Sequence, residues 1–140
     1  MMVVDASVWV SRLVPHDAHH ATSRQWLERR LMEGALLIAP VLVLAEVAGA
    51  LSRQTGWPEL AHRAVDGLSG LAGLRLVSVD TRLGQAAAQL AADLQLRGAN
   101  AIYVATASLL SVPLVTWDSE QRRRAGRLIE VRVPGQTVPS

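Results

Sequence analysis

The chain of 140 residues contains neither cysteine nor lysine. Without cysteine, disulfides, thiolate metal sites and cysteine nucleophiles are all excluded. Without lysine, a P-loop, a Schiff base and a response-regulator site with its charged amine are excluded as well. The basic residues other than histidine are therefore all arginine, and this explains a pI of about 10.4 at a net charge of only +2. The pI itself gives little support for nucleic-acid binding.

Long hydrophobic runs are also lacking. The most apolar stretch, residues 36–51, is short for a membrane span of roughly 20 residues, and Pro40 and Glu46 interrupt it. The N-terminus has no charged start followed by an apolar stretch, as a signal peptide would. We therefore expect a soluble, cytoplasmic protein without membrane contact, with one domain over residues 1–133 and a polar tail over residues 134–140.

Short apolar segments alternate with segments of helical pattern along the chain. The predicted strands are residues 3–4, 36–39, 75–79, 113–116 and 129–133. The predicted helices are residues 7–13, 17–32, 40–54, 59–71, 80–96, 100–111 and 118–127. This alternation is typical of a parallel sheet with helices on both faces and right-handed crossovers. We predict an α/β fold, a three-layer α/β/α sandwich.

Several helix boundaries carry residues that favour them. Pro40 suits the first turn of a helix, and Gly98 suits the end of one. Side chains that favour the N-cap stand at the predicted starts of four helices: Asp17, Asp80, Asn100 and Asp118.

Three acids stand where strands would lead into helices. Asp5 follows the first strand, Glu46 lies in the segment after the second, and Asp118 follows the fourth. Asn100 holds a fourth position of the same kind. Because the carboxyl ends of parallel strands converge on one crevice, these side chains can form one cluster. Hard divalent ions such as Mg²⁺ or Mn²⁺ prefer several oxygen ligands, so the pattern suggests a metal site.

Each position also has a purely structural interpretation. Asp5 can cap the following helix, and Asp118 with Gln121 resembles a capping box. Asn100 is a good N-cap by itself. Glu46 has only apolar or small neighbours at helical spacing, so it needs a partner, either an arginine or a functional group.

Four ordered blocks of the sequence resemble the PIN domain family, and most of all its VapC-type toxins. The blocks are residues 3–9 (VVDASVW), 40–47 (PVLVLAEV), 98–107 (GANAIYVATA) and 114–118 (LVTWD). The resemblance covers nearly the whole chain. It implies a five-stranded parallel sheet in the order 3-2-1-4-5 and a Mg²⁺- or Mn²⁺-dependent endoribonuclease. It also implies a homodimer that a cognate antitoxin holds inactive.

The resemblance assigns roles to particular residues. Asp5, Glu46 and Asp118 match the first, second and fourth acids of the family. Ser7 and Thr116 match small hydroxyl residues of the family that line the same pocket. Asn100 stands where the family usually has aspartate. In the resulting hypothesis, Asp5, Asp118 and Asn100 hold the ion while Glu46 orients or deprotonates the attacking water.

The missing charge at Asn100 leaves a second function open. Removing a negative charge from a metal site lowers its affinity, so the chain is alternatively a weakened PIN fold that binds RNA or antitoxin without cleavage. A phosphatase of the haloacid dehalogenase type is disfavoured, since Ser7 stands where that family has a second aspartate and lysine is absent.

Four arginines follow Asp118 closely in the sequence. They are predicted either to bind RNA phosphates or an acidic antitoxin segment, or simply to form a solvated helix face. The four are Arg122, Arg123, Arg124 and Arg127.

Overall fold

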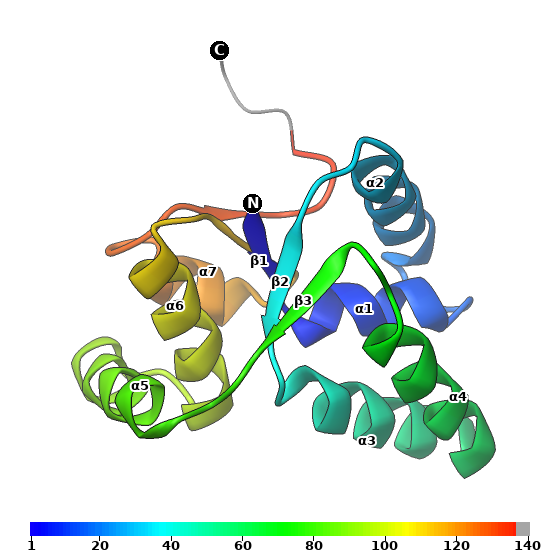
Figure 1. Cartoon of the computed structure of the whole chain (residues 1–140), viewed down its shortest axis with the longest axis horizontal. Helices are drawn as coiled ribbons and strands as arrows, with labels where there is room; N and C mark the ends of the chain where they lie inside the picture. The colour runs from blue at the N-terminus through cyan, green and yellow to red at the C-terminus, as the bar shows by residue number, and fades with distance from the viewer. Residues whose placement is uncertain (137–140) are drawn as a thin grey trace.

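The computed structural model describes residues 1–136 and has a five-stranded parallel sheet at its centre (Figure 1). The strands are β1 (Met2–Val4), β2 (Leu37–Pro40), β3 (Leu74–Val77), β4 (Leu114–Val115) and β5 (Val131–Arg132). Their order is β3-β2-β1-β4-β5, and every pairing is parallel. The predicted order 3-2-1-4-5 is therefore confirmed. The predicted tail over residues 134–140 lies mostly outside the described residues.

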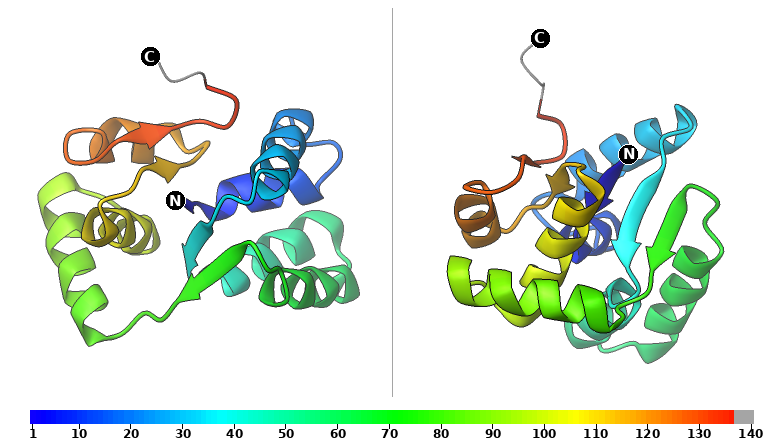
Figure 2. Two further views of the ribbon diagram at one scale, coloured as in Figure 1. Left: turned by 45° about the horizontal axis from the view of Figure 1, so that its top comes forward. Right: turned by 60° about the vertical axis from the view of Figure 1, so that its left-hand side comes forward.

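Helices cover both faces of this sheet. One group consists of α1 (Ala6–Leu13), α2 (His20–Met32), α3 (Val43–Thr55) and α4 (Pro58–Ser69). The other consists of α5 (Thr81–Leu94), α6 (Gly98–Leu110) and α7 (Ser119–Ala125). Figure 1 and the left-hand view of Figure 2 show the two groups on opposite sides of the strands. The predicted three-layer sandwich is confirmed.

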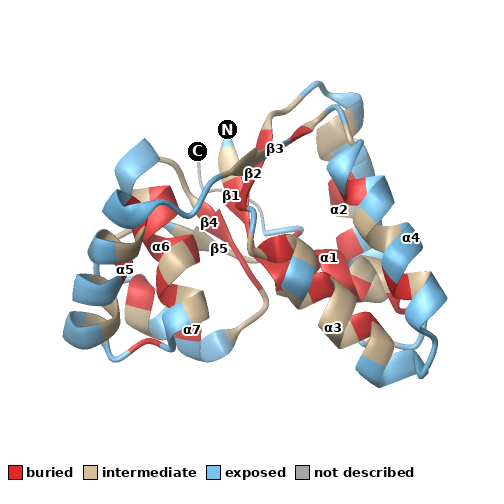
Figure 3. Cartoon of the chain, turned by 60° about the horizontal axis from the view of Figure 1, so that its bottom comes forward, coloured by how far each residue is buried: buried red, intermediate tan, exposed pale blue. Residues whose placement is uncertain are grey.

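The core lies where the central strands meet the inner sides of α1 and α6 (Figure 3). Val3, Val4, Leu37 and Leu114 are fully buried, as expected for parallel strands that are covered on both faces. Burial of each such side chain stabilises the fold by roughly 1.5–3 kcal/mol relative to exposure. This packing fixes the carboxyl ends of β1 and β4, where the candidate residues emerge.

Two predicted helix starts are wrong. Pro40 is the last residue of β2, paired with Val77, and α3 begins only at Val43. A proline at the end of a strand is tolerated because its missing N–H breaks no ladder. Asp17 accepts the backbone N–H of His19 at 2.8 Å and so stabilises a turn before α2, which begins at His20.

The boundary between α5 and α6 also differs from the prediction. Gln95, in a left-handed conformation with φ of 55°, ends α5 in place of Gly98, which is the first residue of α6. Arg97 occupies the N-cap position, so Asn100 lies inside the first turn of α6. Asp80 caps α5 as predicted. Among residues 1–136, no helix is both long and apolar enough to cross a membrane.

Candidate active site

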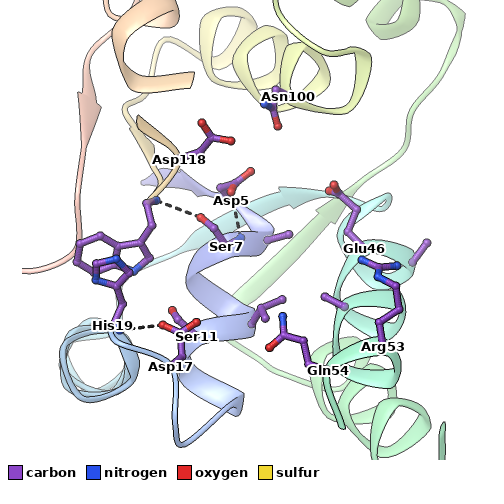
Figure 4. Close-up of a pocket in the computed structure, with 15 residues that line it drawn as sticks. Asp5, Ser7, Ser11, Asp17, His19, Glu46, Arg53, Gln54, Asn100 and Asp118 are labelled. Carbon is purple, nitrogen blue, oxygen red and sulfur yellow. Dashed lines mark hydrogen bonds between the residues drawn. The ribbon is translucent and has the colours of Figure 1, made fainter. Parts of the chain in front are cut away.

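A pocket of about 520 Å³ opens at the carboxyl ends of β1 and β4. Its lining brings together the four residues predicted to act in catalysis: Asp5, Glu46, Asn100 and Asp118. Figure 4 shows Asp5 at the end of β1, with Asp118 and Asn100 on one side and Glu46 of α3 on the other. The sheet order therefore joins positions up to 113 residues apart in the chain.

One carboxylate oxygen of Asp5 caps a helix, and the other is free. Its Oδ2 caps α1 by accepting the backbone N–H of Ser7 at 3.0 Å, and it also accepts the hydroxyl of Thr116 at 3.1 Å. Within residues 1–136 no hydrogen bond reaches Oδ1. Burial raises the pKa of the Asp5 carboxyl, hydrogen bonds from Ser7 and Thr116 lower it, and the charge of Asp118 raises it further.

Two hydroxyl groups tie the ends of β1 and β4 together. Ser7 Oγ lies 3.3 Å from Thr116 Oγ1 and accepts the backbone N–H of Trp117 at 3.1 Å. Thr116 Oγ1 in turn accepts the backbone N–H of Asp118 at 3.1 Å. Of the two hydroxyl residues expected at the pocket, Ser7 lies in its lining, whereas Thr116 is fully buried and is not among the lining residues. Thr116 therefore helps to position Asp5 through the hydrogen bond from its hydroxyl.

Asp118 resembles Asp5 in using only one of its two carboxylate oxygens to cap a helix. Its Oδ1 caps α7 by accepting the backbone N–H of Gln121 at 2.9 Å, while Oδ2 receives no hydrogen bond from the described residues. The predicted capping box is only half formed, because the Gln121 side chain donates instead to the backbone oxygen of Asn100 at 3.3 Å. This contact links the start of α7 to the start of α6.

Glu46 is half-buried and is held by a residue that sequence analysis missed. The hydroxyl of Tyr103 donates a hydrogen bond of 2.7 Å to Glu46 Oε1. Burial raises the pKa of Glu46; the Tyr103 hydrogen bond opposes this and the charge of Asp5 adds to it. Burial and the adjacent carboxylate raise the pKa of Tyr103 far above its ordinary value. The position of Tyr103, one turn after Asn100 on α6, was the signal that could have identified it.

The donor atoms suit a hard divalent cation that keeps part of its water shell. Within residues 1–136, no three His, Cys, Asp or Glu side chains lie close enough together to form a metal site by themselves. Asp5 and Asp118 nevertheless offer one free carboxylate oxygen each, and the Asn100 amide faces the same pocket (Figure 4). Mg²⁺ is commonly held by one or two carboxylates with several retained waters, so this set is sufficient.

The four predicted RNA- or antitoxin-binding arginines differ in their placement. Arg124 lines a hollow of about 280 Å³ that shares Asn100 and Asp118 with the main pocket. It also pairs with Glu120 at 2.6 Å, as does the exposed Arg123. The remaining two, Arg122 and Arg127, line neither of these pockets.

Other polar residues of the pocket wall were not predicted from the sequence, among them two basic side chains. Arg53 and His19 line the same pocket as the acids. Arg53 extends back along α3, where its guanidinium lies close over Gly49, and no carboxylate of the described residues lies within 4.0 Å of it. Neither residue is adjacent to an acid in the sequence or stands directly after a strand, so only the fold shows that they lie at this pocket.

The family model of the PIN domain matches residues 2–127. The chain belongs to the PIN domain family. No curated protein sequence matches it significantly. Its PIN fold is similar to the sarcin–ricin-loop-cleaving toxin VapC20 of Mycobacterium tuberculosis, with a TM-score of 0.79 and 20% identity over 94% of this chain and 99% of that chain.

Two further solved structures share the PIN fold. FitAcB of Neisseria gonorrhoeae has a TM-score of 0.73 and 18% identity over 98% of this chain and 100% of that chain. VapBC2 of Rickettsia felis, bound to a DNA fragment from its promoter, has a TM-score of 0.70 and 14% identity over 94% and 97%. PIN domains of VapC toxins are generally nucleases, so the family assignment agrees with the predicted class of enzyme.

Proposed function

We propose that this PIN domain is a metal-dependent endoribonuclease, the toxin of a type II toxin–antitoxin pair. One observation carries the proposal: Asp5 and Asp118 each keep a carboxylate oxygen free in a pocket that Glu46 also faces. Capping alone would use the bonded oxygens and would not require the two free ones to share a pocket. Membership in the PIN family supports the reaction class.

Asp5, Asp118 and Asn100 would hold Mg²⁺ or Mn²⁺, directly or through water. When bound, the ion would offset negative charge on the scissile phosphate and favour ionisation of a nearby water. The two caps keep both carboxylates oriented before substrate arrives, since Oδ2 of Asp5 and Oδ1 of Asp118 are fixed by backbone N–H groups.

Glu46 would orient the attacking water and accept its proton. The Tyr103 hydroxyl occupies Oε1, which leaves Oε2 for the water. A carboxyl whose pKa is raised by burial is a stronger base than an exposed one, and this suits general-base catalysis near neutral pH. The water oxygen would bond to phosphorus as the bond to the leaving ribose oxygen breaks, without a covalent intermediate on the protein.

The partners we propose are RNA as substrate, a cognate antitoxin protein and a second copy of the chain, in the cytoplasm. Similarity to toxin–antitoxin complexes supports the antitoxin. Arg124 would bind a phosphate next to the scissile one, because it lines the hollow that continues past Asn100 and Asp118. Its neighbours Arg122, Arg123 and Arg127 would add a weaker, longer-range attraction.

A second candidate function rests on Asn100. Its amide brings no charge, so a site with two carboxylates would bind metal more weakly than one with three. In this alternative the chain binds RNA or antitoxin without cutting.

The test is cleavage of a mixed RNA pool with Mg²⁺, with Mn²⁺ and with EDTA, comparing the unchanged chain with Asn100→Asp and Asp5→Asn. Metal-dependent cleavage by the unchanged chain that is lost in Asp5→Asn would support the nuclease. Cleavage only by Asn100→Asp would favour the weakened binder. If none of the three proteins cuts RNA with either metal, the nuclease proposal is wrong.

A further inference from the structure

A stacked pair of rings borders the candidate active site. The rings of His19 and Trp117 are nearly parallel, with an interplanar angle of 8° and 3.7 Å between their centroids. Both residues line the pocket that contains the acids, and Trp117 directly precedes Asp118. Figure 4 labels His19 among the residues that line the pocket.

Trp117 is held in place from two directions. Its backbone N–H donates to Ser7 Oγ at 3.1 Å, and its indole Nε1–H donates to Ser23 Oγ at 2.8 Å. Ser23 is itself fully buried and lies 2.6 Å from the hydroxyl of Ser11. Two buried hydroxyl groups of α1 and α2 thus fix the indole of a residue that is only half-buried.

His19 is exposed although it stacks on this fixed indole. Because Trp117 covers one face of the imidazole, another flat group can stack on this ring only from its opposite face. The turn before α2 holds the residue from behind, since the His19 backbone N–H donates to Asp17. The result is a flat, accessible and preoriented ring at the pocket wall.

We propose that the outer face of His19, supported by Trp117, is the binding site for one unpaired nucleobase of the RNA next to the cleaved bond. Unpaired bases stack on aromatic side chains, including histidine, and such stacking tolerates different bases because each has a flat π-face. The substrate class is therefore single-stranded RNA or an RNA loop. The inference builds on the proposed function in taking RNA as the ligand.

The site lies at a suitable place relative to the acids. Ser7 connects the two directly, because its Oγ accepts the Trp117 N–H while its own backbone N–H donates to Asp5. A base on His19 would thus rest on a ring pair that is held by Ser7, the same residue that positions the carboxylate of Asp5. The stack would fix which phosphate reaches Asp5 and Asp118, and so would act on substrate positioning.

The test measures binding without cleavage, in the Glu46→Gln background with Mg²⁺. The probes are two fluorescently labelled oligoribonucleotides of equal length and charge, an oligoadenylate and its abasic counterpart, whose integrity is checked by gel afterwards. Stacking predicts that the base-bearing oligomer binds about tenfold more tightly than the abasic one. His19→Ala should abolish that preference, and His19→Tyr should retain it, because tyrosine keeps a ring at this position.

Other roles of His19 would give different results. If His19→Ala weakens the binding of both oligomers equally, the residue acts through charge or through structure, and the stacking proposal is wrong; the unfolding temperature then separates those two causes. Equal binding of both oligomers by the parent protein also overturns it. A base preference that depends on His19, combined with failure of the unchanged chain and of Asn100→Asp to cut RNA in the cleavage test above, would uphold the stack while refuting the nuclease. If His19→Ala leaves RNA binding unchanged but weakens the binding of a purified antitoxin, the stack serves a protein partner instead.

Discussion

The hydroxyl of Tyr103 on α6 donates a 2.7 Å hydrogen bond to Oε1 of Glu46 on α3. The contact joins helices from the two opposite faces of the sheet, so it depends on the whole fold. It also favours the ionised form of Glu46 against the effect of burial.

Tyr103→Phe should therefore raise the pKa of Glu46 further. The acid limb of the pH–rate profile would move to higher pH, so activity would fall most at low pH and recover as pH rises. Loss of the hydrogen bond should lower the free energy of unfolding by about 1 kcal/mol. The measurement is single-turnover cleavage from pH 5 to 9. A uniform loss of rate across that range would contradict the proposed role of Tyr103.

Asp5→Asn and Asp5→Ala form a matched pair at the first acid. Both should lose activity by roughly 100-fold or more, because either change removes the charge that holds the ion and orients the reaction. Only Asp5→Ala removes the N-cap acceptor of α1 and should lose about 1 kcal/mol of stability. Cleavage rates and urea unfolding in EDTA would be compared. Full activity in Asp5→Asn would eliminate Asp5 as a metal ligand.

The pH dependence of stability offers a separate test of the same carboxyl. The raised pKa of Asp5 means that the folded state holds this proton more tightly than the unfolded chain, whose reference value is 3.8. In EDTA the contribution of Asp5 to stability should thus fall as pH rises above that value. Asp5→Asn lacks this loss, so it should be more stable than the unchanged chain at neutral pH, with the gap closing toward pH 3. Urea unfolding across this range measures the gap.

Asn100→Asp should increase affinity for divalent metal by restoring a third carboxylate. At 100 times the dissociation constant, a ligand stabilises the folded state by about 2.7 kcal/mol, so metal affinity can be read from thermal unfolding without any assay of cleavage. We expect the Mg²⁺-dependent rise in unfolding temperature to occur at lower metal concentration in Asn100→Asp than in the unchanged chain. Asn100→Ala should shift it the opposite way. Identical titrations in all three proteins would place Asn100 outside the metal site.

Arg124→Gln should weaken RNA binding and lower the dependence of log affinity on log salt by about one unit for each phosphate that the side chain no longer binds. Arg24→Gln is the control, since Arg24 is an exposed arginine of α2 that pairs with Glu28 and lines neither pocket near the acids. Fluorescence anisotropy at several salt concentrations supplies both slopes. Equal slopes for the two variants would assign Arg124 to helix stabilisation through Glu120.

The layered α/β fold and the convergence of the acids could be predicted from short-range patterns in the sequence, whereas the strand order came from the resemblance to PIN domains. Apolar strands and their spacing predicted the layers, and the caps at Asp5 and Asp118 follow from local chain geometry. Predictions at Pro40 and Asn100 were less accurate. Each residue suits more than one position near a helix start. Pairing with β3 keeps Pro40 in its strand, and the turn at Gln95 starts α6 early enough that Asn100 lies inside it.

Contacts between distant helices could not be predicted in the same way. Nothing in the local sequence pairs Tyr103 with Glu46, or His19 with Trp117, since their separations reach 57 and 98 residues. Such pairs form only when the helices pack on the sheet and bring side chains that are distant in the sequence into contact. The acids can therefore be identified from the sequence pattern, whereas the residues that position them are identified only from the tertiary packing.

The double role of two acids restricts how this protein can lose its activity in the course of selection. Asp5 and Asp118 each cap a helix, so most replacements there also weaken the fold. The side chain of Asn100 caps no helix, because Arg97 holds that position. A lineage under pressure to silence a harmful nuclease, yet to keep a folded protein, could change an acid at this position without losing a helix cap. Asn100, where the resemblance expects an aspartate, is thus a position at which a negative charge can be absent while both helix caps remain.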